Sequence, residues 1–400
     1  MTYQTSGESH GPCLTAIVGG LPAGMGVSID EINASLARRQ QGFGRGGRMK
    51  IERDTVEITS GVRFGKTLGS PVTLVVANDD WKNWTDRMSV TPLTPAQRKR
   101  LSDDPLGAPV TQPRPGHVDL AAIMKWDQTD IRNVLERASA RATTTQVAVG
   151  SLAKQLLRVF GIEVISHMLQ LGKVRATVGD LSLTQIQRRA LDDEDFHCVD
   201  ESARDKMLRA VRRARREGDT LGGVNEIIAV GLPPGLGSCM DWDERLDGRL
   251  AGALMAVQAM KGVEIGMGFA AAERLGSEVH DEIVPRRRRN PLDIAYARTR
   301  NNAGGLEGGI TNGEPLVIRV AQKPISTLMR PLRSVDIRTK RSVDAVRERS
   351  DTTAVPAGGV ICEHVVAIVI AQAFLEKFGG DSMTEIRRNH RGYLRQIAKM

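Results

Sequence analysis

Two segments of the chain each occur twice, in the same order, and this repetition constrains the fold more than any other feature. AIVGGLPAGMG (Ala16–Gly26) resembles IIAVGLPPGLG (Ile227–Gly237), and GSPVTLVVA (Gly69–Ala77) resembles GEPLVIRVA (Gly313–Ala321). The first pair lies 211 residues apart (16 to 227) and the second pair 244 (69 to 313). Both members of the first pair have the pattern of a β-branched strand followed by a Gly/Pro turn and a helix.

The repetition predicts a single domain over residues 1–400, built from two related α+β halves that span roughly 1–200 and 201–400. We expect the halves to pack about a pseudo-twofold axis, with ligand sites where they meet. The unequal spacings place insertions in the second half. Chance similarity between Gly/Pro turns is the alternative interpretation.

Apolar spacing and capping residues predict the main helices. One helix begins at a capping box formed by Ser28 and Glu31 and runs through LARRQQ. Four more are predicted over the following ranges: Asp130 to about Phe160, Ala203–Glu217, Asp241 to about Met260, and the apolar, buried Val360–Phe378. The Arg-rich PRRRRN (Pro285–Asn290) is expected in a loop.

The charge balance indicates an anionic partner. Lysine and arginine number 56 against 47 acidic residues, a formal net charge of +9. Nucleic acid, an acidic membrane surface and a multiply charged metabolite all fit this charge. Aromatic residues make up only 4%, which argues against a surface that stacks on many bases.

The cysteines and the N-terminus favour a cytoplasmic protein. Because the four cysteines form no C-x-x-C pair, we expect reduced thiols and no metal site. MTYQTSGESHG has neither the basic start nor the apolar core of a signal peptide. The longest uncharged apolar run, Val365–Leu375, is shorter than a membrane span.

Two of the seven histidines lie in unusual settings. His10 lies in GESHG and His117 in RPGH, so both are flanked by glycine, which lets a ligand or another backbone approach closely. Histidine is also the side chain best suited to proton transfer near neutral pH. A satisfied structural histidine is the alternative for each, and the nearby arginines weigh against it.

An arginine cluster lies in ARRQQGFGRGGRMK, at a helix end and in a glycine-rich loop. Arginine forks bind carboxylate and phosphate, and glycine lets backbone N–H groups point at the same anion. The alternative is an RGG-like nucleic-acid segment, but such segments are long and repetitive. The motif therefore favours an ordered anion site.

Three more motifs carry polar groups suited to ligand binding. In ERASAR, Arg137 and Arg141 are four apart and would share a helix face around Ser139. NNAGGLEGGITNG followed by KPIST suits a phosphate or a flat ring, although it is neither a Walker loop nor a Rossmann fingerprint. RSD, before the apolar helix, offers a cation, a hydroxyl and a carboxylate.

These motifs together resemble one family. GESHG, ERASARATTTQVAVGSL and RSDTTAVPAGGVICEHV resemble the three signatures of the chorismate synthase family. GFGRGGRM, RPGH, QAMKG, GGLEGGITNG and KPIST are similar to further blocks of that family, in the same order. The resemblance covers nearly the whole chain, and one departure is PRRRRN with the residues around it, which match no block of the family.

The resemblance implies a lyase that converts 5-enolpyruvylshikimate 3-phosphate to chorismate and phosphate by an anti-1,4-elimination. It implies bound reduced FMN with no net redox change, and a β-α-β sandwich with an internal pseudo-twofold repeat. It also implies a homotetramer that binds neither nucleic acid nor membrane. NADPH, or a separate flavin reductase, would supply the reducing power.

The resemblance also implies roles for individual residues. His10 would donate a proton to the flavin, His117 would protonate the departing phosphate, and Asp351 would relay a proton, with Ser9 and Ser139 as further candidates. Contacts with substrate or NADPH are implied for Ser9, Arg39, Arg45, Arg48, Arg114 and Arg141. Flavin contacts are implied for Arg137, Ala138, Ser139, Gln258, Ala259, Gly308, Lys323, Pro324, Ile325, Ser326, Thr327 and Arg349.

Two other functions would also account for some of these features. A nucleic-acid-binding protein would show steeply salt-dependent binding to any polynucleotide. A flavin oxidoreductase with a net redox product would consume one NADPH per turnover.

Overall fold

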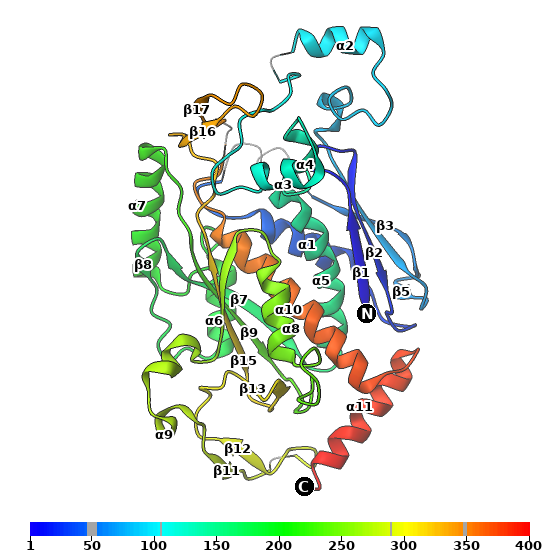
Figure 1. Cartoon of the computed structure of the whole chain (residues 1–400). Coiled ribbons are helices and arrows are strands. Elements are labelled where there is room, and N and C mark those ends of the chain that lie inside the picture. The colour runs from blue at the N-terminus through cyan, green and yellow to red at the C-terminus, as the bar shows by residue number, and fades with distance from the viewer. Residues whose placement is uncertain (46–53, 105, 289, 347–349) are drawn as a thin grey trace.

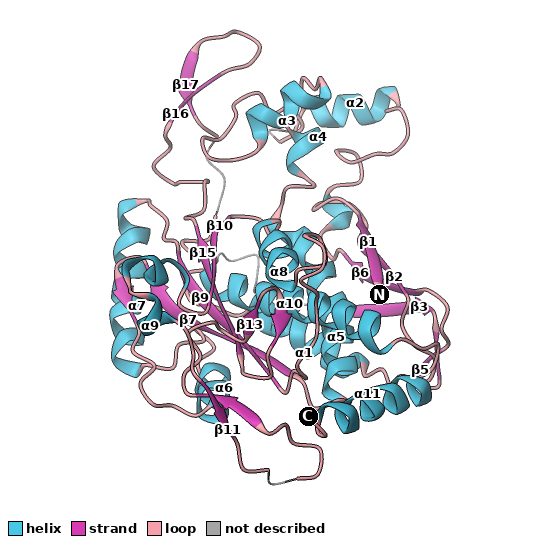
Figure 2. Cartoon of the chain, turned by 60° about the horizontal axis from the view of Figure 1, so that its bottom comes forward, coloured by secondary structure: helices cyan, strands magenta, loops and turns pink. Residues whose placement is uncertain are grey.

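The computed structural model describes residues 1–45, 54–104, 106–288, 290–346 and 350–400. Two antiparallel sheets enclose a layer of helices (Figures 1 and 2). The first sheet has the strand order β1-β2-β6-β3 and the second β10-β15-β9-β7-β8. Their strands are β1 (Thr2–Ser6), β2 (Cys13–Gly19), β3 (Val56–Ser60), β6 (Val72–Ala77), β7 (Glu163–Leu171), β8 (Val174–Arg175), β9 (Gly223–Val230), β10 (Met260–Ile265) and β15 (Leu316–Gln322).

Four helices form the middle layer: α1 (Ile29–Gln40), α5 (Thr143–Arg158), α8 (Leu246–Met255) and α10 (Val355–Phe378). Helix α10 packs on the other three, α5 also contacts β2, and α10 also contacts β7 and β9. One continuous apolar core therefore joins both sheets through these helices. The predicted α+β class and the β-α-β sandwich are confirmed.

The two halves repeat in three dimensions as they do in sequence. In the first sheet Ala16 of β2 lies opposite Leu74 of β6. In the second sheet Ile227 of β9 lies opposite Ile318 of β15. These residues are related by the same spacings of 211 and 244 as the sequence repeats. A one-residue slip would reverse every side chain, so the shared register supports two related halves about a pseudo-twofold axis.

The Gly/Pro turns also repeat in detail. The Thr67 hydroxyl donates to the Pro22 carbonyl oxygen at 2.5 Å and accepts from the Met25 N–H at 2.9 Å. The same two bonds recur at 2.7 and 2.8 Å in the second half, between Thr311, Pro233 and Leu236. Chance similarity of turns does not account for matching side-chain bonds.

The apolar helix α10 is the core of the molecule. It is the one helix of the described chain that could cross a membrane by length and composition, with a mean hydropathy of 1.9. In the structure 89% of that apolar stretch is buried inside the protein. Its sequence therefore reflects packing on every side by α1, α5, α8 and the second sheet.

The predicted helix over 130–160 is wrong as a single element. The chain forms α4 (Arg132–Leu135), leaves the helix, and starts again through a short 3₁₀ turn into α5. Ser139 is extended (φ −69°, ψ 145°), and its hydroxyl accepts from the Arg141 N–H. Arg137 and Arg141 therefore do not share a helix face.

Other boundaries differ less. The helix expected over 241–260 is shorter at both ends, α8 (Leu246–Met255), and the left-handed Ala259 (φ 70°) lies between its end and β10. Ser28 caps α1 by accepting from the Glu31 N–H, but Glu31 itself pairs with Arg158 instead of completing a capping box. The Arg-rich helix α7 (Glu201–Glu217) and the buried helix α10 are confirmed, the latter starting five residues early.

The remaining elements lie around this sandwich. They are β4 (Val62–Arg63), β5 (Lys66–Thr67), β11 (Ile283–Pro285), β12 (Tyr296–Arg298), β13 (Leu306–Glu307), β14 (Ile310–Thr311), β16 (Arg333–Val335), β17 (Ser342–Asp344), α2 (Pro95–Ser102), α3 (Asp119–Trp126), α6 (Leu183–Asp192), α9 (Gly276–Val279) and α11 (Met383–Ile397). Helices α2, α3 and α4 and the β16–β17 hairpin lie together at one end of the sandwich (Figure 1). Pro285 of PRRRRN ends β11, and the described residues after it lie in the loop toward β12, where the motif was expected.

Candidate active site

His10 lies in the turn between β1 and β2. Gly7 starts this turn with φ 103°, and a Cβ there would lie 2.4 Å from the Cys13 carbonyl oxygen, so only glycine fits. His10 Nδ1 lies 2.9 Å from both carboxylate oxygens of Glu136, and its ring stacks on Trp84 with 3.8 Å between centroids. The turn therefore presents His10 in a fixed orientation.

Two predicted serines meet beside this histidine. The Ser9 hydroxyl donates to the Ser139 hydroxyl at 3.0 Å, and the Ser9 N–H donates to the Glu136 carbonyl. Arg137 is exposed and donates to the carbonyls of Thr5 and Gly7, so it anchors the turn to the end of β1. ERASAR thus reaches the site as the irregular link between α4 and α5.

Arg39 and Arg141 share one buried carboxylate. Arg39 Nη2 lies 2.6 Å from Asp54 Oδ2, and Arg141 Nη1 lies 3.2 Å from Asp54 Oδ1. Burial lowers the pKa of the Arg39 guanidinium, and the charge of Asp54 opposes this shift. No sequence motif pointed to Asp54, and its pairing with both arginines could be seen only in the fold.

Arg45 and Asp351 come together from opposite ends of the chain. Arg45 Nε lies 3.1 Å from Asp351 Oδ2, and Arg45 Nη1 donates to the Arg39 carbonyl at 3.1 Å. Burial lowers the pKa of Arg45, opposed first by Asp351. Two other predicted site residues, Arg48 and Arg349, lie outside the described residues.

The second histidine lies beside the KPIST motif. His117 Nδ1 bonds to Asp119 Oδ1, and Arg114 Nε donates to Asp119 Oδ2 at 2.8 Å. Arg114 Nη1 reaches the Thr327 hydroxyl at 3.4 Å, and Lys323 Nζ donates to the Gly116 carbonyl. The RPGH motif is therefore docked on the segment that follows β15.

KPIST is itself held by the neighbouring segments. The Lys323 N–H donates to the Ala259 carbonyl at 2.9 Å, and the Thr220 hydroxyl donates to the Ile325 carbonyl at 2.7 Å. The Leu221 N–H donates to the Thr352 carbonyl, next to Asp351. One continuous set of contacts thus joins the RPGH, KPIST and RSD motifs.

Gly308 lies away from the KPIST motif within this chain. It is exposed in the β13–β14 hairpin, which contacts the β9–α8 loop. Leu316 and Gln322 bound β15, and seven residues of strand span about 20 Å. Lys323 directly follows the C-terminal end of β15, whereas the hairpin that carries Gly308 comes before its N-terminal end. Gly308 and Lys323 therefore lie toward opposite ends of this strand.

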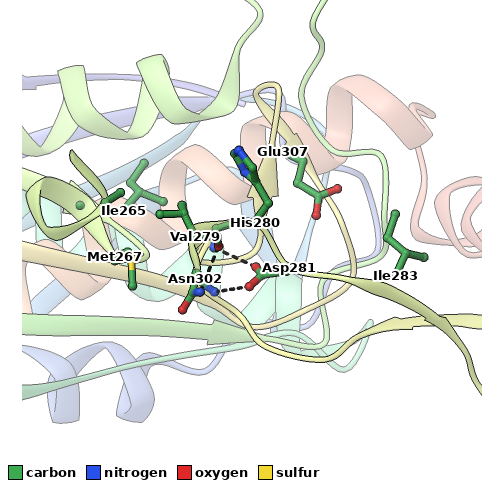
Figure 3. Close-up of a pocket in the computed structure, with 11 residues that line it drawn as sticks. Ile265, Met267, Val279, His280, Asp281, Ile283, Asn302 and Glu307 are labelled. Carbon is green, nitrogen blue, oxygen red and sulfur yellow. Dashed lines mark hydrogen bonds between the residues drawn. The ribbon is translucent and has the colours of Figure 1, made fainter. Parts of the chain in front are cut away.

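A cavity of about 410 Å³ lies near the Gly308 end of the second sheet (Figure 3). Ile265, Met267, Asp281 and Asn302 are among the residues that line it, and the Asp281 carboxylate accepts backbone N–H bonds from Asn302 and Ala303. None of the predicted site residues lines this cavity. Within the described chain, no group of three or more potential ligands could hold a metal ion.

Comparison with known proteins decides the family. Residues 1–375 match the family model described as chorismate synthase. The chain is 54% identical over 399 residues to a chorismate synthase from Pelobacter propionicus, and 55% identical over 400 residues to one from Geobacter sulfurreducens, with 99% of each chain covered in both cases. The chain belongs to the chorismate synthase family.

The solved structures agree with this assignment. A crystal structure of chorismate synthase superposes with a TM-score of 0.78 at 39% identity, covering 100% of this chain and 98% of the other. Chorismate synthases are carbon–oxygen lyases that form chorismate in the final step of the shikimate pathway, and this is the activity of the chain.

Proposed function

We propose that the chain eliminates phosphate from 5-enolpyruvylshikimate 3-phosphate with reduced FMN, at the end of the sandwich that carries His10 and His117. The supporting observation is that two histidines, each held by a buried carboxylate, occur with buried arginines of the first half and with Lys323 of the second half, which bonds to the His117 turn. Among the described residues, Arg39 and Arg141 share the single carboxylate of Asp54, so this cluster carries more positive than negative charge. A substrate with two carboxylates and a phosphate would compensate that excess.

The residues that would hold FMN fit an anionic, hydrogen-bonding ring system. Burial and the charge of Lys261 lower the pKa of Lys323, so two lysines stand close together beside the hydroxyls of Ser326 and Thr327. Two neighbouring cations favour a phosphate group. Gln258 Oε1 is buried and has no hydrogen-bond partner among the described residues, as suits the N–H of a bound ring.

The proposed cofactor site therefore comprises Arg137, Ala138, Ser139, Gln258, Ala259, Gly308, Lys323, Pro324, Ile325, Ser326, Thr327 and Arg349. Reduced flavin, when bound, lends electron density for the loss of phosphate and recovers it as the ring hydrogen leaves. The protein orients substrate and cofactor and supplies the charges around them.

The arginines would bind the anions of the substrate. Arg39 and Arg141 are paired through Asp54, Arg45 with Asp351, and Arg114 with Asp119, so each is oriented before the ligand arrives. We assign Arg39, Arg45, Arg114 and Arg141 to the substrate, together with Arg48 and Ser9. Arg39 and Arg45 are also the proposed NADPH contacts.

The two histidines would act as proton donors at different ends of the reacting system. His117 gives a proton to the phosphate oxygen as the C–O bond breaks, and His10 gives one to the flavin. Asp351 relays a proton near the flavin, assisted by Ser9 and Ser139. Arg45 holds the Asp351 carboxylate in place for this role.

We further propose a cytoplasmic homotetramer that is reduced by NADPH or by a separate flavin reductase. The position of Gly308 supports an oligomer, because that residue can reach a flavin beside Lys323 only from a neighbouring subunit. Multi-angle light scattering of the purified protein tests this directly. A monomer at micromolar concentration would exclude Gly308 from the cofactor site.

The activity is tested by anaerobic phosphate release from 5-enolpyruvylshikimate 3-phosphate with chemically reduced FMN. We expect His10→Ala and His117→Ala each to lower turnover by roughly 10²- to 10⁴-fold without loss of fold. Near wild-type turnover in either variant would remove that histidine from the mechanism. Arg48→Ala should mainly raise the KM, and an unchanged KM would remove Arg48 from the anion site.

A further inference from the structure

Both active-site histidines are held at Nδ1 by carboxylates to which neither the motifs nor the family resemblance assigned a role. His117 Nδ1 bonds to Asp119, whose side chain is 1% exposed. His10 Nδ1 bonds to Glu136, whose side chain is 3% exposed. The same local arrangement therefore occurs twice in one site.

Asp119 is an anion that organises the whole RPGH turn. It accepts from the Arg114 N–H at 3.0 Å, from Arg114 Nε at 2.8 Å and from Nη2 at 3.1 Å, in addition to His117. Burial acts to raise the pKa of Asp119, but the bonds from His117 and Arg114 outweigh it and hold the pKa well below its usual range. The carboxylate is therefore charged at neutral pH.

Glu136 fixes His10 through the backbone as well as the ring. Its Oε2 accepts from the His10 N–H at 2.8 Å, and its carbonyl accepts from the Ser9 N–H. Trp84 covers one face of the imidazole, with 28° between the two ring planes. Both the plane of the ring and the partner of Nδ1 are thereby determined.

The two carboxylates stand on one small structural unit. Asp119 is the first residue of α3, and Glu136 directly follows α4. The two helices pack together through the apolar cluster of Ala122, Ile123, Ile131, Val134 and Leu135. Because the unit is packed as one cluster, both histidines are aligned by the same rigid support.

Resting on the proposed function, we propose that Asp119 and Glu136 are positioning residues that keep a proton on Nδ1 of His117 and His10, so that each imidazole works through Nε2. A carboxylate can only accept, so the hydrogen of each bond belongs to the ring nitrogen. Arg114 Nη2, which can only donate, also lies 3.1 Å from His117 Nδ1, but the contact of Nδ1 with Asp119 is shorter and Nη2 donates to Asp119 Oδ1 instead. The partner on one ring nitrogen sets the role of the other.

The proton balance at His117 follows from this arrangement. The doubly protonated imidazolium gives its Nε2 proton to the phosphate oxygen as the C–O bond breaks. The neutral ring keeps its proton on Nδ1 and still donates it in a hydrogen bond to Asp119. Asp119 itself is never protonated. The Asp119 carboxylate thus keeps its bond to Nδ1 before and after Nε2 gives up its proton.

Asp119→Asn and Glu136→Gln test the proposal, because each keeps the size of the side chain and removes its charge. We expect kcat to fall roughly 10- to 100-fold in each variant, less than on removal of the imidazole. For Glu136→Gln the substrate KM should stay within about threefold, since that carboxylate holds no predicted substrate arginine. Asp119→Glu and Glu136→Asp should recover part of the loss.

Double variants separate positioning from general structural damage. Asp119→Asn should lower kcat no further in a His117→Ala background, although the lost bonds to Arg114 should still raise the substrate KM. Glu136→Gln should lower kcat no further in a His10→Ala background. Asp193→Asn is the matched control: Asp193 is also buried and bonds to Arg204 and the Cys198 N–H, without contact to either histidine. We expect this variant to keep the wild-type kcat.

A readout independent of activity is ¹⁵N NMR of the enzyme labelled at the histidine rings, with no flavin or substrate added. In the wild type both rings should be protonated at Nδ1, and each charge-removing variant should change that state only at its own histidine. Unchanged ring signals, losses that add to those of the alanine variants, or an equal loss in Asp193→Asn would each overturn the proposal. Absence of phosphate release by the wild type would instead refute the proposed function.

Discussion

Glu363 on α10 is fully buried at the centre of an ion cluster, and its replacement by glutamine should strongly destabilise the protein. The carboxylate accepts from Arg38 Nη1 at 2.9 and 2.8 Å and from the Ser166 hydroxyl at 2.7 Å, and it also bonds to Lys154. These partners come from α1, β7 and α5, so the cluster ties three elements of the first half to helix α10 of the second half.

The magnitude follows from what the substitution leaves behind. Glutamine preserves the volume, but Arg38 and Lys154 lose their compensating anion, and their side chains are only 16% and 30% exposed. Removing one partner of a buried ion pair typically costs about 3–5 kcal/mol. Because Lys154 can turn partly toward water, we expect the lower end, about 3 kcal/mol.

The effect should depend on pH in a defined direction. Burial acts to raise the pKa of Glu363, but the charges of Arg38 and Lys154 outweigh it and hold the pKa well below its ordinary value of 4.5. A lowered pKa in the folded state stabilises the protein above the unfolded pKa and less as pH falls below it. The difference between wild type and Glu363→Gln should therefore shrink below about pH 4.5.

Urea unfolding followed by circular dichroism at pH 7 and pH 4 measures both effects. The control is Glu31→Gln, which breaks the exposed Glu31–Arg158 pair and should cost less than about 1 kcal/mol. A loss of under 1 kcal/mol for Glu363→Gln at pH 7 would contradict the reasoning, as would a loss equal to that of the control.

Three further predictions concern single residues. Gly7→Ala should abolish most activity, because Gly7 has φ 103° and the new Cβ would lie 2.4 Å from the Cys13 carbonyl oxygen, so the turn that carries His10 must move. A crystal structure of the variant in which this turn has not moved would contradict the prediction. Cys239 is exposed, whereas burial raises the pKa of the Cys362 thiol to about 12. A thiol reagent should therefore modify Cys239 in the native enzyme and Cys362 only after unfolding, which mass spectrometry of the labelled peptides measures. Burial, and then the charge of Lys154, lowers the pKa of His364 to about 3. As pH falls below 6.5 the unfolded state therefore binds the His364 proton first, and the free energy of unfolding should fall by up to about 1.4 kcal/mol per pH unit. A His364→Asn variant with an unchanged acid unfolding curve would show that His364 does not cause this loss of stability.

The fold was predictable from sequence where local pattern and topology agree. The repeated strand–turn segments indicated two halves, and the register of Ala16 with Leu74 and of Ile227 with Ile318 follows the same spacings. The prediction of one helix over 130–160 was wrong because ERASARA is rich in helix-forming residues, so its local sequence gives no sign of a break. Contacts of Glu136 with Ser9 and His10, more than 120 residues away in sequence, compete with the helix there.

The candidate site likewise contains residues that the sequence indicated and residues whose role only the fold shows. Glycine-flanked histidines and arginine-rich motifs indicated His10, His117 and Arg39 because residue type and local setting carry that information. The carboxylates that orient them could not be assigned in the same way. Asp119 lies two residues from His117 and Glu136 next to Arg137, so both were visible in sequence, but only the fold shows which ring each one holds.

The central claim is that the flavin is used repeatedly and is not consumed. The direct measurement is the ratio of phosphate released to flavin oxidised, under strict anaerobiosis, with a large excess of 5-enolpyruvylshikimate 3-phosphate over chemically reduced FMN. The account predicts many phosphates and an equal number of chorismate molecules per flavin, with the flavin still reduced when the substrate is exhausted. One phosphate per flavin, accompanied by full flavin oxidation, would contradict it.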